Sequence, residues 1–303
     1  MITEPGIYPD MDEATYHADP CPHPSLSSSI VRTIIGSTLA HAHLQHPRLG
    51  GKDHKATDAT DAGTLLHSLV MGRVADPVLV DAPDWKKKAA QTERDEARAA
   101  GKVVFLRRQH EALQVAAGHI RRFMSCLPGN PLGPDYANEV TLIWQEPNGV
   151  WCKARPDFFP YRASRQAIIY DLKTSEMSAE PKASSRRLSN MGAYIQAALY
   201  RRGYRVLFGV EPRFVFVPAE IDPPYACVPI EFSPASLALA DRMIDQAVQA
   251  WGQALRTAEF PAYPVKIVRV DIPPWVENEW IEREQKDLDE AERPIRQLED
   301  MEI

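Results

Sequence analysis

Residues 168–175 read IIYDLKTS, and this stretch decides how the chain folds. Its apolar, β-branched start predicts a buried strand. Side chains of a strand alternate between two faces, so Asp171 and Lys173 share a face with Ile169. Ionised side chains are costly inside a sheet unless they are paired or hold a metal ion. An acid and a base two residues apart at the end of a buried strand therefore indicate a functional site.

A second acid precedes this strand. Residues 139–160, EVTLIWQEPNGVWCKARPDFFP, predict a hairpin of two strands around a Pro-Asn-Gly turn. By the same alternation we expect Lys153, Arg155 and Asp157 to share one face, with Asp157 near the strand end. Two carboxylates from neighbouring strand ends, with a lysine beside them, suit a hard divalent cation and an activated water. The alternative is that Asp171 and Lys173 form an ion pair at the strand edge and that Asp157 is a turn residue.

Strands and helices alternate along the rest of the chain, which predicts an α/β fold. A segment rich in charge, residues 83–101, predicts an exposed arm or helix, and the helix over 189–204 is expected to close at Gly203. Further helices are predicted at 26–35, 60–72, 105–127 and 233–255, and further strands at 213–220 and 225–232.

The charge is unevenly distributed over the 303 residues. The net charge is −6, but residues 276–303 hold eleven acidic and four basic residues, a net of −7. Residues 1–275 therefore carry a net of +1, and their basic clusters permit a phosphate-binding surface. Four widely spaced cysteines argue against an iron–sulfur cluster. No signal peptide or membrane-spanning stretch is visible, so we expect a cytoplasmic protein without membrane contact.

Five short motifs occur in an order that resembles a known nuclease superfamily. RPD (155–157) followed by DLK (171–173) resembles the P-D…(D/E)-x-K core of the restriction-endonuclease-like nucleases. The remaining motifs resemble the RecB/RecE branch, and most closely the RecE-type exonuclease VIII domain: GTLLH ending at His67, Glu139 in NEVTLIW, and QAALY with Gln196 and Tyr200.

The resemblance implies a restriction-endonuclease-like core, with a central mixed β-sheet flanked by helices. It implies one nuclease domain over residues 1–275 and an acidic helical tail over 276–303. Within that domain we expect an N-terminal extension (1–60), a catalytic core (61–220) and a C-terminal strand and helix (221–275).

The resemblance also implies roles for the motif residues. Mg²⁺, for which Mn²⁺ can substitute, is expected to be held by the carboxylates of Asp157 and Asp171, the Leu172 carbonyl and His67. Lys173 is expected to orient the attacking water, and Glu139, Gln196 and Tyr200 to support the site. Alternatively, His67 is a core histidine, Glu139 a surface residue, and Gln196 and Tyr200 structural. Candidate DNA contacts are Lys153, Arg155, Arg186 and Arg187, although Arg155 could instead pair with an acid.

The expected activity is exonucleolytic hydrolysis of linear double-stranded DNA from its 5′ end, in phage-type recombination. The resemblance further implies a ring-shaped homo-oligomer, a tetramer or trimer, that binds double-stranded DNA ends, and a single-strand annealing recombinase as partner. The acidic tail could dock that recombinase or an adjacent subunit, or be a solvated end. The alternatives are a structure-specific or helicase-associated endonuclease of the same superfamily, and a catalytically silent DNA-binding module.

Overall fold

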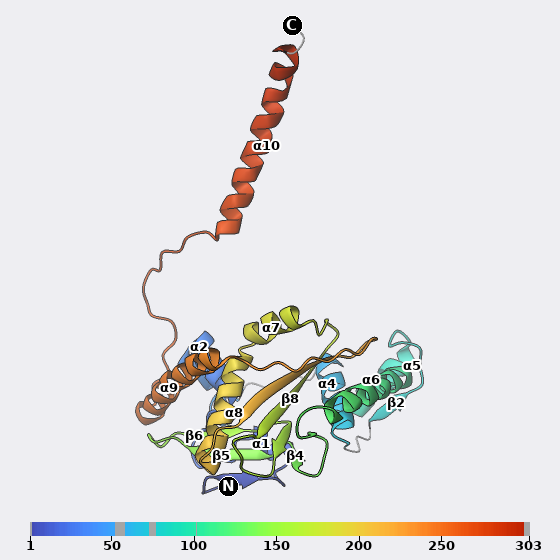
Figure 1. Cartoon of the computed structure of the whole chain (residues 1–303), viewed down its shortest axis with the longest axis vertical. Coiled ribbons are helices and arrows are strands. Elements are labelled where there is room, and N and C mark those ends of the chain that lie inside the picture. The colour runs from blue at the N-terminus through green and yellow to red at the C-terminus, as the bar shows by residue number, and fades with distance from the viewer. Residues whose placement is uncertain (1, 52–57, 73–76, 101, 300–303) are drawn as a thin grey trace. The chain divides into compact units, whose positions relative to one another are not determined.

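The structure is a computed structural model that describes residues 2–51, 58–72, 77–100 and 102–299 (Figure 1). The chain divides into two units, Met1–Ala262 and Tyr263–Ile303. The second unit contains the helix α10 (Pro274–Glu299), which agrees with the helix expected in the tail. In the part of the chain that is described, no helix has the length and apolar character needed to cross a membrane.

A four-stranded mixed sheet carries the stretch that opened the sequence. Its order is β4-β7-β8-β9, with β8 antiparallel to β7 and parallel to β9 over eight residues. The strands are β4 (Tyr136–Asn138), β7 (Phe158–Pro160), β8 (Ile168–Ser175) and β9 (Arg213–Glu220). The predicted α/β class and the mixed sheet are confirmed.

Two smaller sheets complete the strand content of the described residues. Strand β5 pairs with both β1 and β6 in antiparallel fashion, which confirms the predicted hairpin, and β2 pairs with β3 in parallel. The strands are β1 (Gly6–Tyr8), β5 (Thr141–Gln145), β6 (Trp151–Ala154), β2 (Val78–Val80) and β3 (Val104–Leu106).

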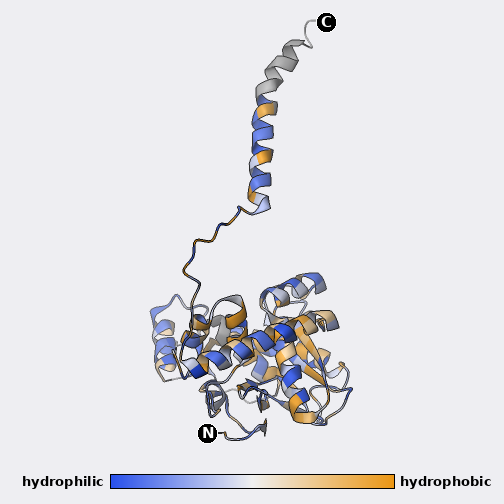
Figure 2. Cartoon of the chain, turned by 90° about the vertical axis from the view of Figure 1, so that its left-hand side faces the viewer, coloured by the Kyte–Doolittle hydropathy of each residue, from blue (hydrophilic) through white to orange (hydrophobic). Residues whose placement is uncertain are grey.

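Helices cover both faces of the mixed sheet (Figure 1). They are α1 (Glu13–His17), α2 (Ser28–Gly36), α3 (Leu39–Gln45), α4 (Asp58–Val70), α5 (Lys88–Ala99), α6 (Arg107–Ser125), α7 (Pro181–Asn190), α8 (Ala193–Phe208) and α9 (Pro234–Thr257). Of the two forms expected over 83–101, an exposed arm or a helix, the structure has a helix, α5. Figure 2 shows that the strands in the interior, in contrast, are predominantly hydrophobic.

Strand β8 separates two hydrophobic clusters by simple alternation. Ile169 packs in the cluster beneath α8 and α9, whereas Tyr170 and Leu172 pack in the cluster beneath α4 and α6. All three side chains are at most 1% exposed. Asp171 follows Ile169 on the α8 face, so the alternation read from the sequence places its carboxylate against α8.

One predicted helix boundary and one predicted strand are wrong. Helix α8 does not close at Gly203 but continues to Phe208 and ends on Gly209, whose φ of 70° is left-handed. Gly203 instead makes room for a ring, since a Cβ there would lie 2.6 Å from Trp144. Residues 225–232 do not form the predicted strand; only the isolated bridges from Cys227 and Ile230 to β9 are present.

Candidate active site

Asp171 and Lys173 form an ion pair within β8, which continues to Ser175, so they do not lie at the strand end as expected from the sequence. Lys173 Nζ lies 2.5 Å from Asp171 Oδ1, and Gln196 Nε2 on α8 donates a hydrogen bond of 2.6 Å to Asp171 Oδ2. Asp171 is 2% exposed, and its Oδ1 has the ion pair with Lys173 but accepts no hydrogen bond from the described residues. A carboxylate so deeply buried is maintained by these two donors, which therefore fix its orientation.

Asp157 lies in the loop between β6 and β7 and reaches the same strand. Its Oδ2 accepts a hydrogen bond of 2.8 Å from the Leu172 backbone N–H, and His67 Nδ1 on α4 lies 3.5 Å from that oxygen. The structure therefore brings Asp157, the DLK motif and His67 together. The Leu172 carbonyl as a metal ligand stays a prediction.

Glu139 reaches the site through an unusual backbone conformation. It lies between β4 and β5 with a φ of 52°, a left-handed value that is strained for a residue with a Cβ. Its N–H donates a hydrogen bond of 3.0 Å to the Asp157 carbonyl, and its carboxylate lies 3.3 Å from Arg155 Nη2. Glu139 thus fixes the backbone that carries Asp157 and pairs with the neighbouring arginine.

Burial dominates the electrostatics of this group. It raises the pKa of the Asp157 carboxyl well above its usual range, and the charge of Asp171 raises this pKa further. Burial also lowers the pKa of His67, with Lys173 adding to the effect, so the imidazole is neutral at pH 7. Burial alone would lower the pKa of Lys173, but Asp171 and Asp157 outweigh it and raise that pKa, so Lys173 is charged.

The donors fit a hard divalent cation in their chemistry. A cation would reduce the repulsion between the two carboxylates and would be coordinated by their oxygens. The neutral imidazole could supply a nitrogen as a further ligand. Within the described residues, however, no three His, Cys, Asp or Glu side chains are arranged as a closed metal site. Both Asp171 oxygens are engaged by Lys173 and Gln196, so a bound cation would have to share Asp171 with them.

A cleft of about 760 Å³ opens beside the carboxylates. Its walls include the acids Glu139 and Asp157, but not Asp171, together with the hydroxyls of Tyr200 on α8 and of residues from the N-terminal part of the chain: Tyr16, Ser27 and Ser28. Sequence reasoning found the acids and Tyr200 but gave the serines at the start of α2 no role. The available signal was the run of three serines, Ser27–Ser29, at the start of a predicted helix.

The four predicted DNA contacts lie in different environments. Lys153 is 4% exposed, donates to the Tyr16 carbonyl at 2.5 Å and lies 3.6 Å from Asp19. Arg155 donates to Met11 and Thr141 and lines the cleft. Arg186 is exposed on α7, where Arg187 bonds to Ser178 and Ser184.

The expected common face of Lys153, Arg155 and Asp157 requires one continuous strand, which does not exist. Strand β6 ends at Ala154 and β7 begins at Phe158. Lys153 accordingly points toward Asp19, whose carboxylate also accepts hydrogen bonds from Ser25 and lies 3.3 Å from His46. Burial would raise the pKa of Asp19, but His46, Lys153 and Ser25 outweigh it and lower it to about 2. We assign Lys153 to this buried network.

One family profile matches residues 27–269, which is most of the chain, and it describes a PDDEXK-like domain of unknown function (DUF3799). The chain belongs to this family. The PDDEXK-like family confirms the expected superfamily and, with the mixed sheet, the restriction-endonuclease-like core. Among curated proteins, none matches the sequence.

One of two similar solved structures supports the fold of this PDDEXK-like domain. A protein from Eubacterium rectale, provisionally named an exonuclease, aligns with a TM-score of 0.55 at 14% identity, over 87% of this chain and 96% of that one. A phage-related exonuclease from Haemophilus somnus aligns over 78% of this chain and 97% of that one, at 13% identity and a TM-score of 0.31. At these identities the first likeness supports the fold alone, and the second is too weak to add to it.

Proposed function

We propose that this protein is a divalent-metal-dependent exodeoxyribonuclease of the RecE type, which degrades linear double-stranded DNA from the 5′ end. One observation carries the proposal: Asp157 of the RPD motif meets Asp171 and Lys173 of the DLK motif on β8, and Asp157 lines an open cleft. A purely structural fold would have no need for a buried acid, Asp171, placed so that it raises the pKa of a second acid, Asp157. The name of the Eubacterium rectale structure, which calls that protein an exonuclease, also supports this proposal.

Each residue of the site has a role in phosphodiester hydrolysis. Asp157, Asp171, the Leu172 carbonyl and His67 would hold Mg²⁺ or Mn²⁺, which supplies Lewis acidity at the scissile phosphate when bound. Lys173, held protonated by the two acids, orients the attacking water and stabilises negative charge as it develops. Gln196 fixes Asp171, and Tyr200 forms part of the cleft wall near the reacting phosphate.

DNA is held through phosphates, so little sequence preference is expected. Arg155 is the candidate closest to the acids, while Arg186 and Arg187 would contact the duplex from α7. We propose that the protein works as a ring-shaped tetramer or trimer on DNA ends, with a single-strand annealing recombinase as its partner. In such a ring the basic residues face the channel, which reconciles a net charge of −6 with a DNA substrate.

The test is a digest of linear duplex DNA labelled at the 5′ or 3′ end, with Mg²⁺, with Mn²⁺ and with a chelator. We expect metal-dependent release of the 5′ label first, and no cutting of closed circular duplex. Lys173→Ala and Asp171→Ala should abolish the reaction, whereas Asp135→Asn, in an exposed pair with Arg162, should not. Cutting of circles would indicate the endonuclease alternative, and DNA binding without any hydrolysis would indicate a silent binding module.

A further inference from the structure

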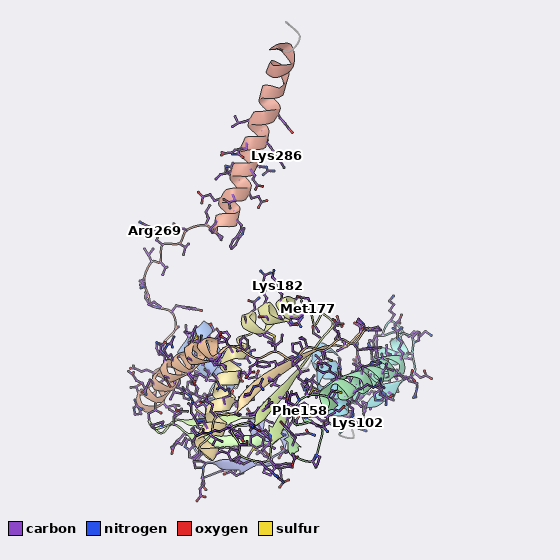
Figure 3. All side chains as sticks on the ribbon, viewed as in Figure 1. Lys102, Phe158, Met177, Lys182, Arg269 and Lys286 are labelled. Carbon is purple, nitrogen blue, oxygen red and sulfur yellow. The ribbon has the colours of Figure 1, made fainter. Side chains whose placement is uncertain are left out.

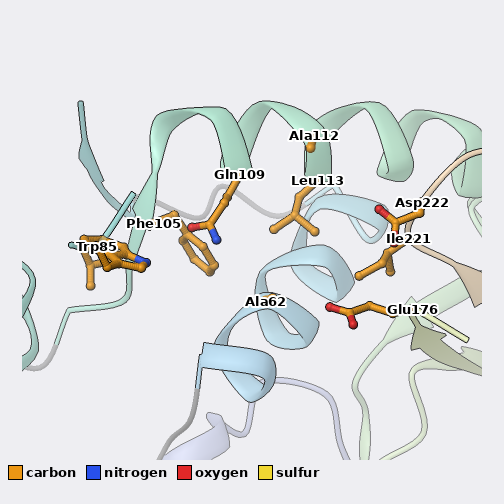
Figure 4. Close-up of a pocket in the computed structure, with 10 residues that line it drawn as sticks. Ala62, Trp85, Phe105, Gln109, Ala112, Leu113, Glu176, Ile221 and Asp222 are labelled. Carbon is orange, nitrogen blue, oxygen red and sulfur yellow. The ribbon is translucent and has the colours of Figure 1, made fainter. Parts of the chain in front are cut away.

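A second cavity, of about 280 Å³, shares no residue with the cleft beside the candidate active site, and it has an apolar part and an acidic part. Figure 4 shows Trp85, Phe105 and Gln109 at one end and Asp222 and Glu176 at the other. The floor between them is aliphatic. The two carboxylates are exposed, and no described cation lies within ion-pairing distance of either. The cavity therefore suits a ligand with an apolar part followed by a cation.

The second unit begins with a segment of that composition. Residues 265–272 read VKIVRVDI, in which five of eight residues are aliphatic. Val265 and Ile267 are fully exposed, at 107% and 101%, and Val270 is 80% exposed. Figure 2 shows hydrophobic and hydrophilic residues alternating along this segment, and Figure 3 marks Arg269 within it. Aliphatic runs this exposed are normally covered by a partner.

Strand geometry would sort this segment into two faces. Val265, Ile267 and Arg269 would share one face because side chains alternate along a strand. That face carries two aliphatic side chains followed by a cation, in the order that the cavity requires. Lys266 and Val268 would lie on the opposite face.

The chain leaves the first unit on the flank opposite this cavity. Phe260 is fixed beside α3 and α9, with its ring 4.4 Å from His43 and 5.7 Å from Trp251. The cavity is lined from α4 and α6, and Figure 1 shows α9 and α6 on opposite flanks of the first unit. Seven residues from Phe260 to Ile267 span at most about 25 Å. A compact domain of this size has a diameter of about 45 Å.

We propose that residues 265–269 of one copy dock as a strand into this cavity of a second copy. Val265 and Ile267 fill the apolar part, and Arg269 pairs with Glu176 and Asp222 at the acidic end. The contact then joins the segment of one copy to the cavity of the next. Two different surfaces of the chain meet, so the contact is heterologous. Heterologous contacts close into rings when the rotation between copies allows it.

The contact would bear directly on the elements that carry the candidate active site. Glu176 follows the last residue of β8, and Ala62, which also lines the cavity, lies on the same helix as His67. Docking would therefore order both elements in the assembled protein. The inference does not depend on the proposed nuclease activity, because it concerns association alone.

Sedimentation velocity of the full chain at micromolar concentrations tests the proposal. Wild type should form an oligomer, and Ile267→Asp should weaken association by about tenfold or more, because a buried aliphatic contact is lost. Arg269→Glu and Glu176→Arg should each weaken it, and the two changes combined in one chain should restore part of the loss. Lys266→Glu, on the opposite strand face, and Val115→Asp, 51% exposed on α6 outside the cavity, are the matched controls.

Mixing variants distinguishes a second copy from other occupants. Ile267→Asp has a weakened segment and Glu176→Arg/Asp222→Arg a weakened cavity, so each alone should be mainly a single chain at a concentration at which wild type is assembled. Their mixture retains one intact contact and should give a species of twice the 34.0 kDa chain mass. A monomeric wild type, an unchanged oligomer in Ile267→Asp, or equal losses in Lys266→Glu and Arg269→Glu would overturn the proposal.

Discussion

Replacing Gln196 by alanine removes the hydrogen bond that fixes Asp171. The bond is 2.6 Å long, the glutamine is 8% exposed and the acceptor is a buried carboxylate. A hydrogen bond to a charged group contributes about 1.5–3 kcal/mol. If that orientation is needed in the transition state, the loss corresponds to a rate about ten- to a hundredfold lower. Asp171 keeps Lys173 as a partner, so activity should fall without disappearing.

Single-turnover digestion of end-labelled linear duplex, at saturating Mg²⁺, measures this effect. Gln253→Ala on the exposed side of α9 is the control for the substitution itself, and it should retain the wild-type rate. A Gln196→Ala rate within twofold of wild type would refute the positioning role. A loss as complete as that of Asp171→Ala would refute it as well, since it would make Gln196 indispensable to the chemistry.

Two further predictions concern stability. Because burial and Asp171 raise the pKa of Asp157, the folded state holds its proton more tightly, and stability falls as pH rises from about 4 through that raised pKa. Thermal unfolding at pH 7 in a chelator should therefore show Asp157→Asn to be more stable than wild type by about 1 kcal/mol. This difference should vanish in acid. Added Mg²⁺ should stabilise wild type but not the variant. Gly203→Ala should cost about 1–2 kcal/mol by denaturant unfolding, because its Cβ would overlap the buried Trp144 ring. The equivalent change at Gly118, where a Cβ meets nothing within 4 Å, should instead stabilise α6, and equal effects at the two glycines would contradict the packing argument.

The features that were read correctly from the sequence have local causes. The alternation in IIYDLKTS follows from strand geometry, and β8 places its two sets of side chains in two different clusters. The hairpin around Pro147-Asn148-Gly149 is likewise encoded by its turn. Periodicity and turn chemistry were therefore sufficient for the α/β class and for the position of Asp171.

The errors arose where a distant contact overrides a local signal. A glycine near the end of a helical pattern usually marks its C-terminus, but Gly203 serves the packing of Trp144 on β5. Residues 225–232 have the composition of a strand and yet contribute only bridges to β9. Neither outcome can be read from neighbouring residues, because each depends on a contact across the fold.

The site was predicted only in part for the same reason. The order of the motifs suggested that Asp157 and Asp171 meet, and the Leu172 N–H links the two in the structure. The left-handed backbone of Glu139 leaves no mark in composition. The partner of Lys153 is Asp19, more than a hundred positions earlier, and no alternation rule connects them.

The pairing of Lys153 with Asp19 also bears on where the domain can be cut. The family profile begins at residue 27, whereas Asp19 and Ser25 precede it and the Leu26 backbone bonds to β6. A chain trimmed to the profile would leave an ammonium group inside the protein with no counter-charge, which costs about 3–5 kcal/mol. The segment before the recognisable nuclease motifs is thus an integral part of the folding unit, and it cannot be exchanged or removed as an independent module.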